Sequence, residues 1–324
     1  RFLRFRFNAY PMDQPGRYFY LRDKHTGDFW SASWQPVGKD LKKYKSSCRF
    51  GTAYAIIDAD YSGIRTRSTY FVPLGQLFEY WLLTVTNTSK KARTLSVFTY
   101  VEPASEWRMY HDLINMQYSQ HIARATYKDG IIGFNLLENL QPDPDHFENA
   151  DQCRRTFLAV AGQKVSGFDT DRDVFIAPYH TYANPAVVER GACTNSLAFG
   201  DNICGTVQIE MTLEPGESKD VIVMLGIGNA AVEGRAVRRE YGSMQRAQRE
   251  LERLRQHWHR HLGNLTVQTP DKDFNSMVNV WNAYNALITF SWSRAASLVY
   301  QGERDGLGFR DTVQDLVGAT PLMT

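Results

Sequence analysis

The chain has 324 residues, which is enough for one or two domains joined by a connector. Hydrophobic residues make up 43% of it and charged residues 22%, a composition typical of a globular protein that buries its own core. Lys and Arg number 37 against 35 Asp and Glu, and the net charge of +2 excludes a protein whose whole surface binds polyanions. No apolar run approaches the roughly 18 to 20 residues of a membrane-spanning helix, so we expect no membrane partner.

The cysteines indicate the redox compartment of the protein, and the two ends of the chain indicate whether the sequence is complete. Cys48, Cys153, Cys193 and Cys204 form no CxxC pair, which disfavours a disulfide framework or a cysteine zinc site and fits the reducing cytoplasm. The chain begins at Arg1 with neither a methionine nor a signal-peptide pattern, and it ends just after a charged motif opens a helix. We therefore interpret it as a fragment.

Residues 1–228 carry the pattern of strands. Short segments rich in β-branched and aromatic residues lie at 18–21, 29–30, 82–86, 94–100, 125–127, 206–213 and 221–225. We expect a two-residue hairpin at Asp129-Gly130, a second hairpin across residues 87–92 and a third across residues 214–217. Many short strands with little helix between them predict an antiparallel β-sandwich.

Residues 229–324 carry a helical pattern instead. Residues 233–262 contain no Pro and are rich in Arg, Glu, Gln, Ala and Leu, which predicts a helical linker over 229–262. After the break at Leu262-Gly263-Asn264, a helix is expected to begin at Asp271, because apolar residues then recur at i, i+3, i+4 and i+7. Residues 263–324 are therefore predicted to be the first helices of an α domain.

Two motifs in the chain resemble known binding loops without meeting their requirements. Gly226, Gly228 and Ala231 match the G-x-G-x-x-A dinucleotide pattern, but that pattern works only in a parallel βαβ unit, and the preceding strand is expected to be antiparallel. Residues 169–173 begin like a calcium loop, yet Val174 stands where an EF-hand needs Gly. We exclude both sites and interpret residues 169–173 as a charged loop between strands.

The linker carries histidines and arginines. His257, His259 and His261 are spaced at i and i+2, positions that point away from each other on a helix, so the three imidazoles do not converge on one metal ion. We interpret them as a solvated helix end near the negative pole of the helix dipole. Residues 235–260 hold eight Arg against three Glu, and we interpret this stripe as a solvated connector rather than a nucleic-acid site.

The stretch from residue 294 to residue 315 concentrates chemistry-bearing residues. It holds three arginines, four carboxylates and three glycines. Arginine forks suit planar or tetrahedral oxyanions, carboxylates suit sugar hydroxyls, and glycines let the backbone approach a ligand. Two interpretations remain open: a ligand site, or a capping box of Asp311 with Gln314 together with ion pairs of Arg304 and Arg310.

The same stretch forms part of a longer pattern. It reads Trp292-Ser293-Arg294-x-Ala296-Ser297 and then Arg304-x-Gly306-x-Gly308-Phe309-Arg310-Asp311-x-x-Gln314-Asp315. Earlier segments belong to the pattern as well: Gly16-Arg17-Tyr18 with Tyr20, Trp30-Ser31-x-Ser33-Trp34-x-Pro36-Val37, Phe71-Val72-Pro73, Asn87-Thr88-Ser89 and Leu213-x-Pro215-Gly216-Glu217. Over most of its length the chain therefore resembles glycoside hydrolase family 94, the inverting disaccharide phosphorylases.

This resemblance implies a multidomain β plus α fold. It places an antiparallel β-sandwich at 1–228, a helical linker at 229–262 and the start of an (α/α)6 catalytic barrel at 263–324. It also implies that the first strands of the sandwich and most of the barrel are missing from this chain. It also implies that Arg294 binds phosphate and that Arg304 and Asp311 bind the sugar on the non-reducing side of the scissile bond. The general acid is an Asp expected C-terminal of this chain, so no catalytic acid is assigned within it.

The resemblance further implies reversible phosphorolysis of a β-linked disaccharide, yielding an α-sugar 1-phosphate plus a monosaccharide or an aldonic acid. Phosphate replaces the water and the base of an inverting hydrolase, because it is already an anionic nucleophile. The implied enzyme is a cytoplasmic homodimer with inorganic phosphate as co-substrate and no metal or other cofactor. The acceptor remains open among cellobiose, chitobiose and cellobionic acid types. An inverting hydrolase on the same fold and a non-catalytic carbohydrate-binding sandwich remain alternatives.

Overall fold

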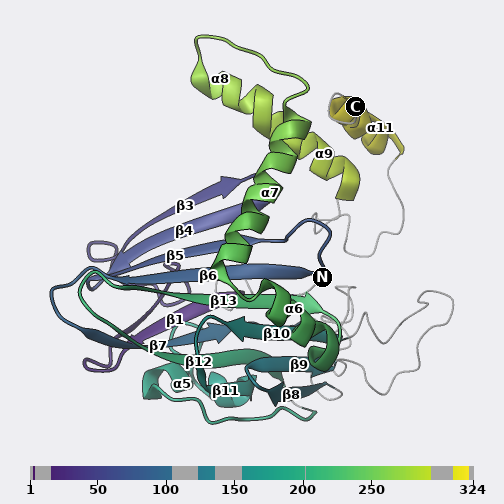
Figure 1. Ribbon diagram of the computed structural model, residues 1–324. Helices are drawn as coiled ribbons and strands as arrows, with labels where there is room; N and C mark the ends of the chain where they lie inside the picture. The colour runs from purple at the N-terminus through teal and green to yellow at the C-terminus, as the bar shows by residue number, and fades with distance from the viewer. Residues whose placement is uncertain are drawn as a thin grey trace, which may run out of the picture. The chain divides into compact units, whose positions relative to one another are not determined.

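The computed structural model describes residue 3 and residues 16–103, 123–135, 155–200, 202–292 and 309–320. The chain divides into two compact units, Arg1–Gln248 and Arg249–Thr324. Figure 1 shows that the described part of the first unit is mostly β-sheet, whereas the described part of the second unit is helical.

Two sheets make up the β part of the first unit. The five-stranded sheet contains, in spatial order, β11 (Val165–Asp171), β12 (Ile203–Leu213), β7 (Arg93–Tyr100), β1 (Tyr18–Asp23) and β2 (Phe29–Ser31). The eight-stranded sheet contains β3 (Lys45–Gly51), β4 (Tyr54–Tyr61), β5 (Ile64–Phe71), β6 (Phe78–Asn87), β13 (Ser218–Ile227), β10 (Arg155–Ala161), β9 (Ile131–Asn135) and β8 (Arg124–Lys128). Every neighbouring pair is antiparallel, which confirms the predicted antiparallel β architecture.

The core lies between the two sheets. Phe19 of β1 and Trp81 of β6 meet there with their ring centroids 6.1 Å apart. Tyr20 points to the opposite face, because successive strand residues alternate, and there it joins a second apolar cluster with residues of α4 (Arg172–Phe175) and α5 (Ala186–Arg190). The five-stranded sheet is therefore covered on both faces.

The hairpin predicted at Asp129-Gly130 is confirmed. β8 and β9 pair antiparallel on either side of it. Asp129 and Gly130 have φ values of 52° and 78°, the left-handed conformation that a two-residue hairpin turn requires and that Asp and Gly tolerate.

The hairpins predicted across residues 87–92 and 214–217 are wrong. β6 and β7 belong to different sheets, and so do β12 and β13, so each connection crosses from one sheet to the other. The sequence shows two strands and a turn in each case, but such a turn can join paired strands or strands stacked face to face. β13 is antiparallel to both β6 and β10, which agrees with the exclusion of the dinucleotide motif.

The two sheet-crossing connections are joined through Asn87. This residue is fully buried, and its amide donates to the carbonyls of Lys91 at 2.8 Å and Leu213 at 2.9 Å. Its backbone N–H donates to the Glu217 carbonyl at 3.0 Å, and its own carbonyl accepts from the Gly216 N–H at 2.8 Å. The connection after β6 therefore lies against the connection after β12.

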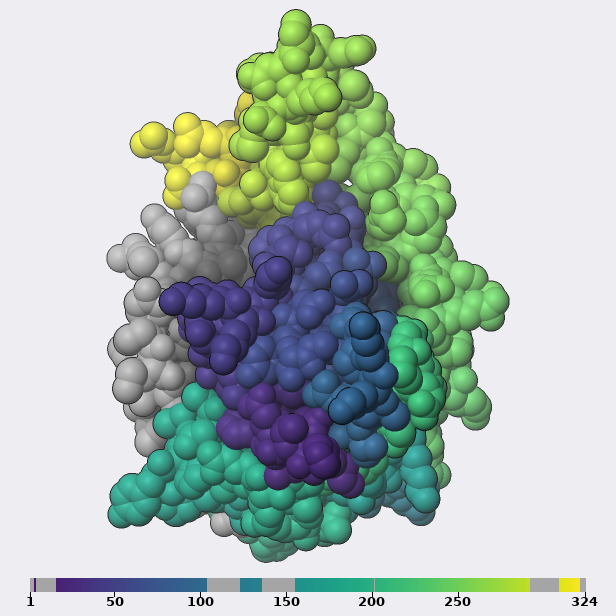
Figure 2. Space-filling model, turned by 90° about the vertical axis from the view of Figure 1, so that its left-hand side faces the viewer, coloured from purple at the N-terminus to yellow at the C-terminus, as the bar shows by residue number. Residues whose placement is uncertain are grey.

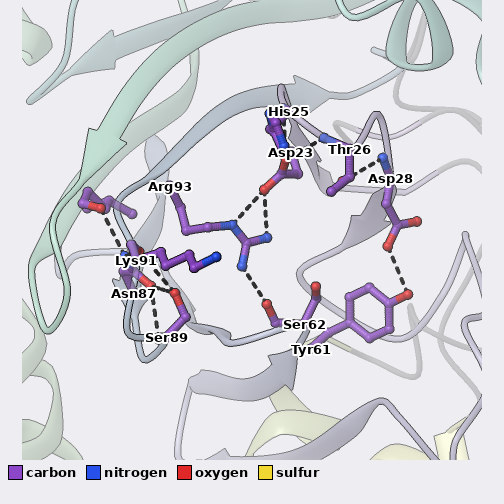
Figure 3. Close-up of polar contacts among 11 residues, drawn as sticks. Asp23, His25, Thr26, Asp28, Tyr61, Ser62, Asn87, Ser89, Lys91 and Arg93 are labelled. Atoms are coloured by element: carbon purple, nitrogen blue, oxygen red, sulfur yellow. Dashed lines mark hydrogen bonds and ion pairs between the residues drawn. The ribbon is translucent and has the colours of Figure 1, made fainter.

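A second polar group links the sheets beside Asn87 (Figure 3). Arg93 of β7 donates to the carboxylate of Asp23 in β1 at 2.6 Å and to the carbonyl of Ser62 at 2.7 Å. Ser62 lies in the turn between β4 and β5, so one guanidinium bonds to both sheets. The Tyr61 hydroxyl donates to the Asp28 carboxylate at 2.9 Å, and burial together with that carboxylate raises the pKa of Tyr61 to about 12.

The edge strand β3 is exposed from Lys45 to Phe50. Figure 2 shows this part of the chain, in indigo, at the surface. Arg49 forms an ion pair with Asp58 of the neighbouring strand β4 at 2.6 Å. Charged side chains such as these on an open edge disfavour pairing with a foreign strand.

Helices follow β13, as the sequence predicts for the segment after residue 229. The first are η1 (Ala230–Gly234, a π-helix), α6 (Arg235–Tyr241) and α7 (Met244–Leu262). Asn229 begins this run: its side chain accepts from the Ala231 N–H at 2.8 Å, and its own N–H donates to Glu233 at 2.7 Å. This reciprocal arrangement resembles a capping box, but the returning glutamate lies one residue further into the helix than in the usual motif.

The second unit contains α8 (Lys272–Ser276), η2 (Met277–Asn282), α9 (Ala283–Trp292) and α11 (Phe309–Ala319). Asp271 caps α8 by accepting from the N–H groups of Asp273 and Phe274 at 2.9 and 3.0 Å, which confirms the predicted helix start. Of the helices in the described ranges, none combines the length and apolar character needed to span a membrane.

Candidate active site

The three residues with predicted ligand-binding roles lie near the end of the chain. Arg294 and Arg304 fall outside the described residues. Asp311 is described: it lies in the first turn of α11, and its side chain is half-buried. The structure therefore places one of the three, within the second unit.

Helices α9 and α11 pack together as an antiparallel pair (Figure 1). A Cβ built on Gly318 of α11 would lie 3.3 Å from the Cβ of Ala286 in α9, which marks a close approach of the two helices. At ~1.5 Å per residue, Asp311 lies about 10 Å from Gly318 along α11, and Trp292 lies about 9 Å from Ala286 along α9. Asp311 is therefore at the same end of the pair as the last residue of α9.

The capping-box interpretation of Asp311 is wrong. α11 begins at Phe309, so Asp311 is the third residue of the helix and not its N-cap. A carboxylate in a first turn is stabilised by the positive end of the helix dipole. Asp311 thus lies in the first turn of α11, and its carboxylate oxygens can accept hydrogen bonds from a pair of hydroxyl groups.

Two asparagines on the long helix α8-η2-α9 fix the chain that leads into it. Asn279 accepts from the Val267 N–H and donates to the Val267 carbonyl, both at 2.8 Å. One turn earlier, Asn275 bonds the N–H and the carbonyl of Thr269 at 2.9 and 2.8 Å. The amides replace the backbone partners that this extended segment would have in a sheet, so the start of the second unit is held firmly against its first helix.

The first unit contains a buried ionic centre that the sequence motifs do not predict. Glu102 is fully buried and accepts from the Tyr100 hydroxyl at 2.6 Å, from Nε of Arg172 at 3.0 Å and from the Tyr182 hydroxyl. Burial and then the Glu102 charge raise the pKa of Tyr100. Burial lowers the pKa of Arg172, but Glu102, Tyr100 and Tyr182 together outweigh it and raise that pKa overall. The one sequence signal is a glutamate two residues after the end of the buried strand β7.

The interpretation of residues 169–173 as a charged loop is also wrong. Asp169 lies in β11, and its buried carboxylate accepts from the N–H and hydroxyl groups of Thr194 and Ser196 at 2.5 to 3.2 Å. Asp171 is the N-cap of α4 and accepts from the Asp173 N–H at 2.8 Å. These carboxylates hold a loop and start a helix, which agrees with the exclusion of an EF-hand.

The fold is thus an antiparallel β-sandwich followed by helices, one of which carries Asp311 in its first turn. Two family descriptions match the chain: "Glycosyl hydrolase 94, supersandwich domain" over residues 1–244 and "Glycosyl hydrolase 94 superfamily, catalytic domain" over residues 257–323. The chain belongs to the glycosyl hydrolase 94 family, as its sequence motifs indicate.

Curated relatives include N,N'-diacetylchitobiose phosphorylases of Vibrio proteolyticus and Vibrio furnissii, 37% and 35% identical over 327 residues. Each alignment covers 100% of this chain and 39% of the relative. Solabiose phosphorylase of Paenibacillus borealis is 30% identical over 300 residues, which cover 92% of this chain and 36% of the relative. The chain thus spans under two fifths of the length of these relatives.

Proposed function

We propose that this protein catalyses reversible, inverting phosphorolysis of a β-linked disaccharide, yielding an α-sugar 1-phosphate and a monosaccharide or aldonic acid. The observation that carries the proposal is the family match over both parts of the chain, with relatives that are named disaccharide phosphorylases. The position of Asp311 supports it, because a helix start at the end of a helix pair is a suitable place for a sugar-binding carboxylate.

Each assigned residue has a separate role in the proposed reaction. The Arg294 fork binds two phosphate oxygens and aims a third at the anomeric carbon, so that no catalytic base is needed. Asp311 accepts from hydroxyl groups of the reacting sugar, and Arg304 donates to its oxygens. Together they help to distort the ring toward its oxocarbenium-like transition state. The general acid is an Asp beyond residue 324.

The proposal also covers the catalytic domain, the oligomeric state and the cellular compartment of the enzyme. The helices of the second unit are the first helices of an (α/α)6 barrel, and Arg294 follows the last residue of α9 by two positions in the sequence. The enzyme acts as a cytoplasmic homodimer and uses inorganic phosphate as co-substrate, without a metal in the reaction. In this proposal the sandwich is one domain of the enzyme and not a separate, non-catalytic carbohydrate-binding protein.

Steady-state phosphorolysis by the full-length enzyme tests the proposal. N,N'-diacetylchitobiose, solabiose, cellobiose and cellobionic acid are offered in turn while the phosphate concentration is varied. We expect one of them to be cleaved at a rate that saturates with phosphate, with sugar 1-phosphate formed in equal amount. Cleavage that proceeds equally well without phosphate identifies an inverting hydrolase instead, and contradicts the proposal.

A further inference from the structure

Two histidines in the last turns of α7 lie on one face of the helix. His257 and His261 are four residues apart, and their ring centroids are 4.5 Å apart. His259, at the i+2 position between them, points away from both, so the three imidazoles do not converge on one ion. Four residues is a different spacing, because positions i and i+4 are neighbours on a helix face.

This geometry points to a two-histidine binding site for a divalent first-row transition metal ion such as Zn²⁺. Histidines at i and i+4 on a helix supply two of the zinc ligands in the H-E-x-x-H motif, and His257 and His261 have that spacing. In this chain Trp258 stands where that motif has its catalytic glutamate, so the site binds a metal without the residue for metalloprotease chemistry.

The separation of the rings fits a shared ion. Metal–nitrogen bonds of about 2.0 to 2.1 Å, at angles of roughly 90° to 110°, place two imidazole centroids about 4.5 to 5 Å apart. The observed 4.5 Å agrees with that range. The rings are inclined by 68° and not stacked, and the outer torsion of a histidine is soft, so both rings can turn a nitrogen toward one point. Each ring has two nitrogens, and a hydrogen bond to one leaves the other available for the metal.

The position in the helix favours a cation. α7 ends at Leu262, and the carbonyls of a last helical turn carry partial negative charge. Arg260 opposes a cation through its own charge, but it is exposed, so water screens the repulsion. In the described parts of the chain no group of three or more His, Cys, Asp or Glu side chains could hold a metal. The two histidines therefore supply two ligands, and water or a further ligand occupies the remaining coordination positions of the metal ion.

The inferred ion would bind at the end of α7, next to the contact between the aromatic rings of Trp258 and Tyr284 in the second unit. The Trp258 ring lies 4.7 Å from the ring of Tyr284 in α9 and 6.5 Å from that of His261. An ion held by His257 and His261 bridges the two turns of α7 on either side of Trp258. We expect it to stabilise this end of the helix, which precedes the break at Gly263.

Calorimetric titration of the full chain with ZnCl2 at about pH 7.5, where imidazoles are neutral ligands, tests the inference. The chain is first treated with EDTA and desalted. We expect His257→Gln or His261→Gln to weaken zinc binding by roughly tenfold or more, because the second ligand then no longer adds its high effective concentration. His259→Gln is the matched control on the same turns and is expected to bind like the original chain. Far-UV circular dichroism checks that each variant is folded.

Copper supplies a second readout that does not depend on stability. In electron paramagnetic resonance of the Cu²⁺-loaded chain, we expect coupling to two imidazole nitrogens, reduced to one in His257→Gln or His261→Gln. The inference is overturned when His257→Gln titrates like the original chain, or when His259→Gln loses as much affinity as the other two. Neither result depends on phosphorylase activity.

Discussion

Nε of Arg93 lies 2.6 Å from the carboxylate of Asp23, and the same guanidinium bonds the Ser62 carbonyl at the turn of the opposite sheet. The Asp23 side chain is 3% exposed and that of Arg93 is 17% exposed, so water screens this pair far less than a surface pair. The contact therefore joins the two sheets at one end of the sandwich (Figure 3).

We predict that Arg93→Ala destabilises the sandwich by roughly 2 to 3 kcal/mol, somewhat below the cost of breaking a fully buried pair. The variant leaves the carboxylate of Asp23 buried without its guanidinium partner. Urea unfolding followed by tryptophan fluorescence measures the change. Arg65→Ala is the matched control, because its pair with Asp60 spans 3.5 Å between exposed side chains and should contribute about 0 to 1 kcal/mol. Equal losses in the two variants would contradict the prediction.

The same pair predicts a dependence of stability on pH. Burial by itself raises the pKa of Asp23, but the Thr26 N–H, the Arg93 guanidinium and the His25 N–H outweigh it and hold that pKa below its ordinary value. A depressed pKa contributes stability above the unfolded value of about 3.9, and the contribution is lost as pH falls through the folded pKa. We expect the stability difference between the original chain and Asp23→Asn to be constant above about pH 5 and to shrink below about pH 4. A difference that stays flat down to pH 3 would show that Asp23 is not the titrating group.

The features of the fold that the sequence predicts are those set by contacts between residues close together in the chain. The hairpin at Asp129-Gly130 and the cap at Asp271 are local, and both are confirmed. The strand that ends at Asn87 is predicted correctly, but its predicted pairing with the strand at 94–100 is wrong, because β6 pairs with β13, which lies more than a hundred residues away in the sequence. The Glu102 centre was missed for the same reason: its donor Arg172 is 70 residues away.

Glu102 offers a prediction about that missed centre. Glu102→Gln keeps the shape of the side chain but removes the charge facing Arg172, and we expect a loss of about 3 kcal/mol or more, the scale of a broken buried pair. Tyr100→Phe removes one hydroxyl donor to the same oxygen and should cost only about 1 kcal/mol. Chemical unfolding of both variants gives the comparison. The prediction fails when Tyr100→Phe is as damaging as Glu102→Gln.

Asn279 offers a prediction for the second unit. In Asn279→Asp the carboxylate still accepts from the Val267 N–H but cannot donate to the Val267 carbonyl, so one of two hydrogen bonds is lost. We expect a cost of about 1 to 2 kcal/mol and faster hydrogen exchange at the Val267 amide by about tenfold. Asn282→Asp, at an exposed position of the same long helix, is the control and should leave that amide unchanged. Unaltered protection of Val267 in Asn279→Asp would show that the segment is held by other contacts.

The proposed roles of Arg294 and Asp311 predict different kinetic losses in the full-length enzyme. Arg294→Ala removes a charge-assisted contact to phosphate, worth roughly 1.5 to 3 kcal/mol, so kcat/KM for phosphate should fall about ten- to a hundred-fold or more. Asp311→Asn should instead lower kcat/KM for the disaccharide by a similar factor at every phosphate concentration, because it acts on the sugar.

The control for this last pair lies on the same helix as Asp311. Gln314 is exposed in α11, and Gln314→Ala should leave both kinetic constants within about twofold, since alanine favours helix and the side chain has no assigned ligand. Circular dichroism of the three variants separates loss of contact from loss of fold. A phosphate dependence that is unchanged in Arg294→Ala would remove that arginine from the phosphate site. A defect in Asp311→Asn that Gln314→Ala reproduces would assign Asp311 to the start of α11 and not to the sugar.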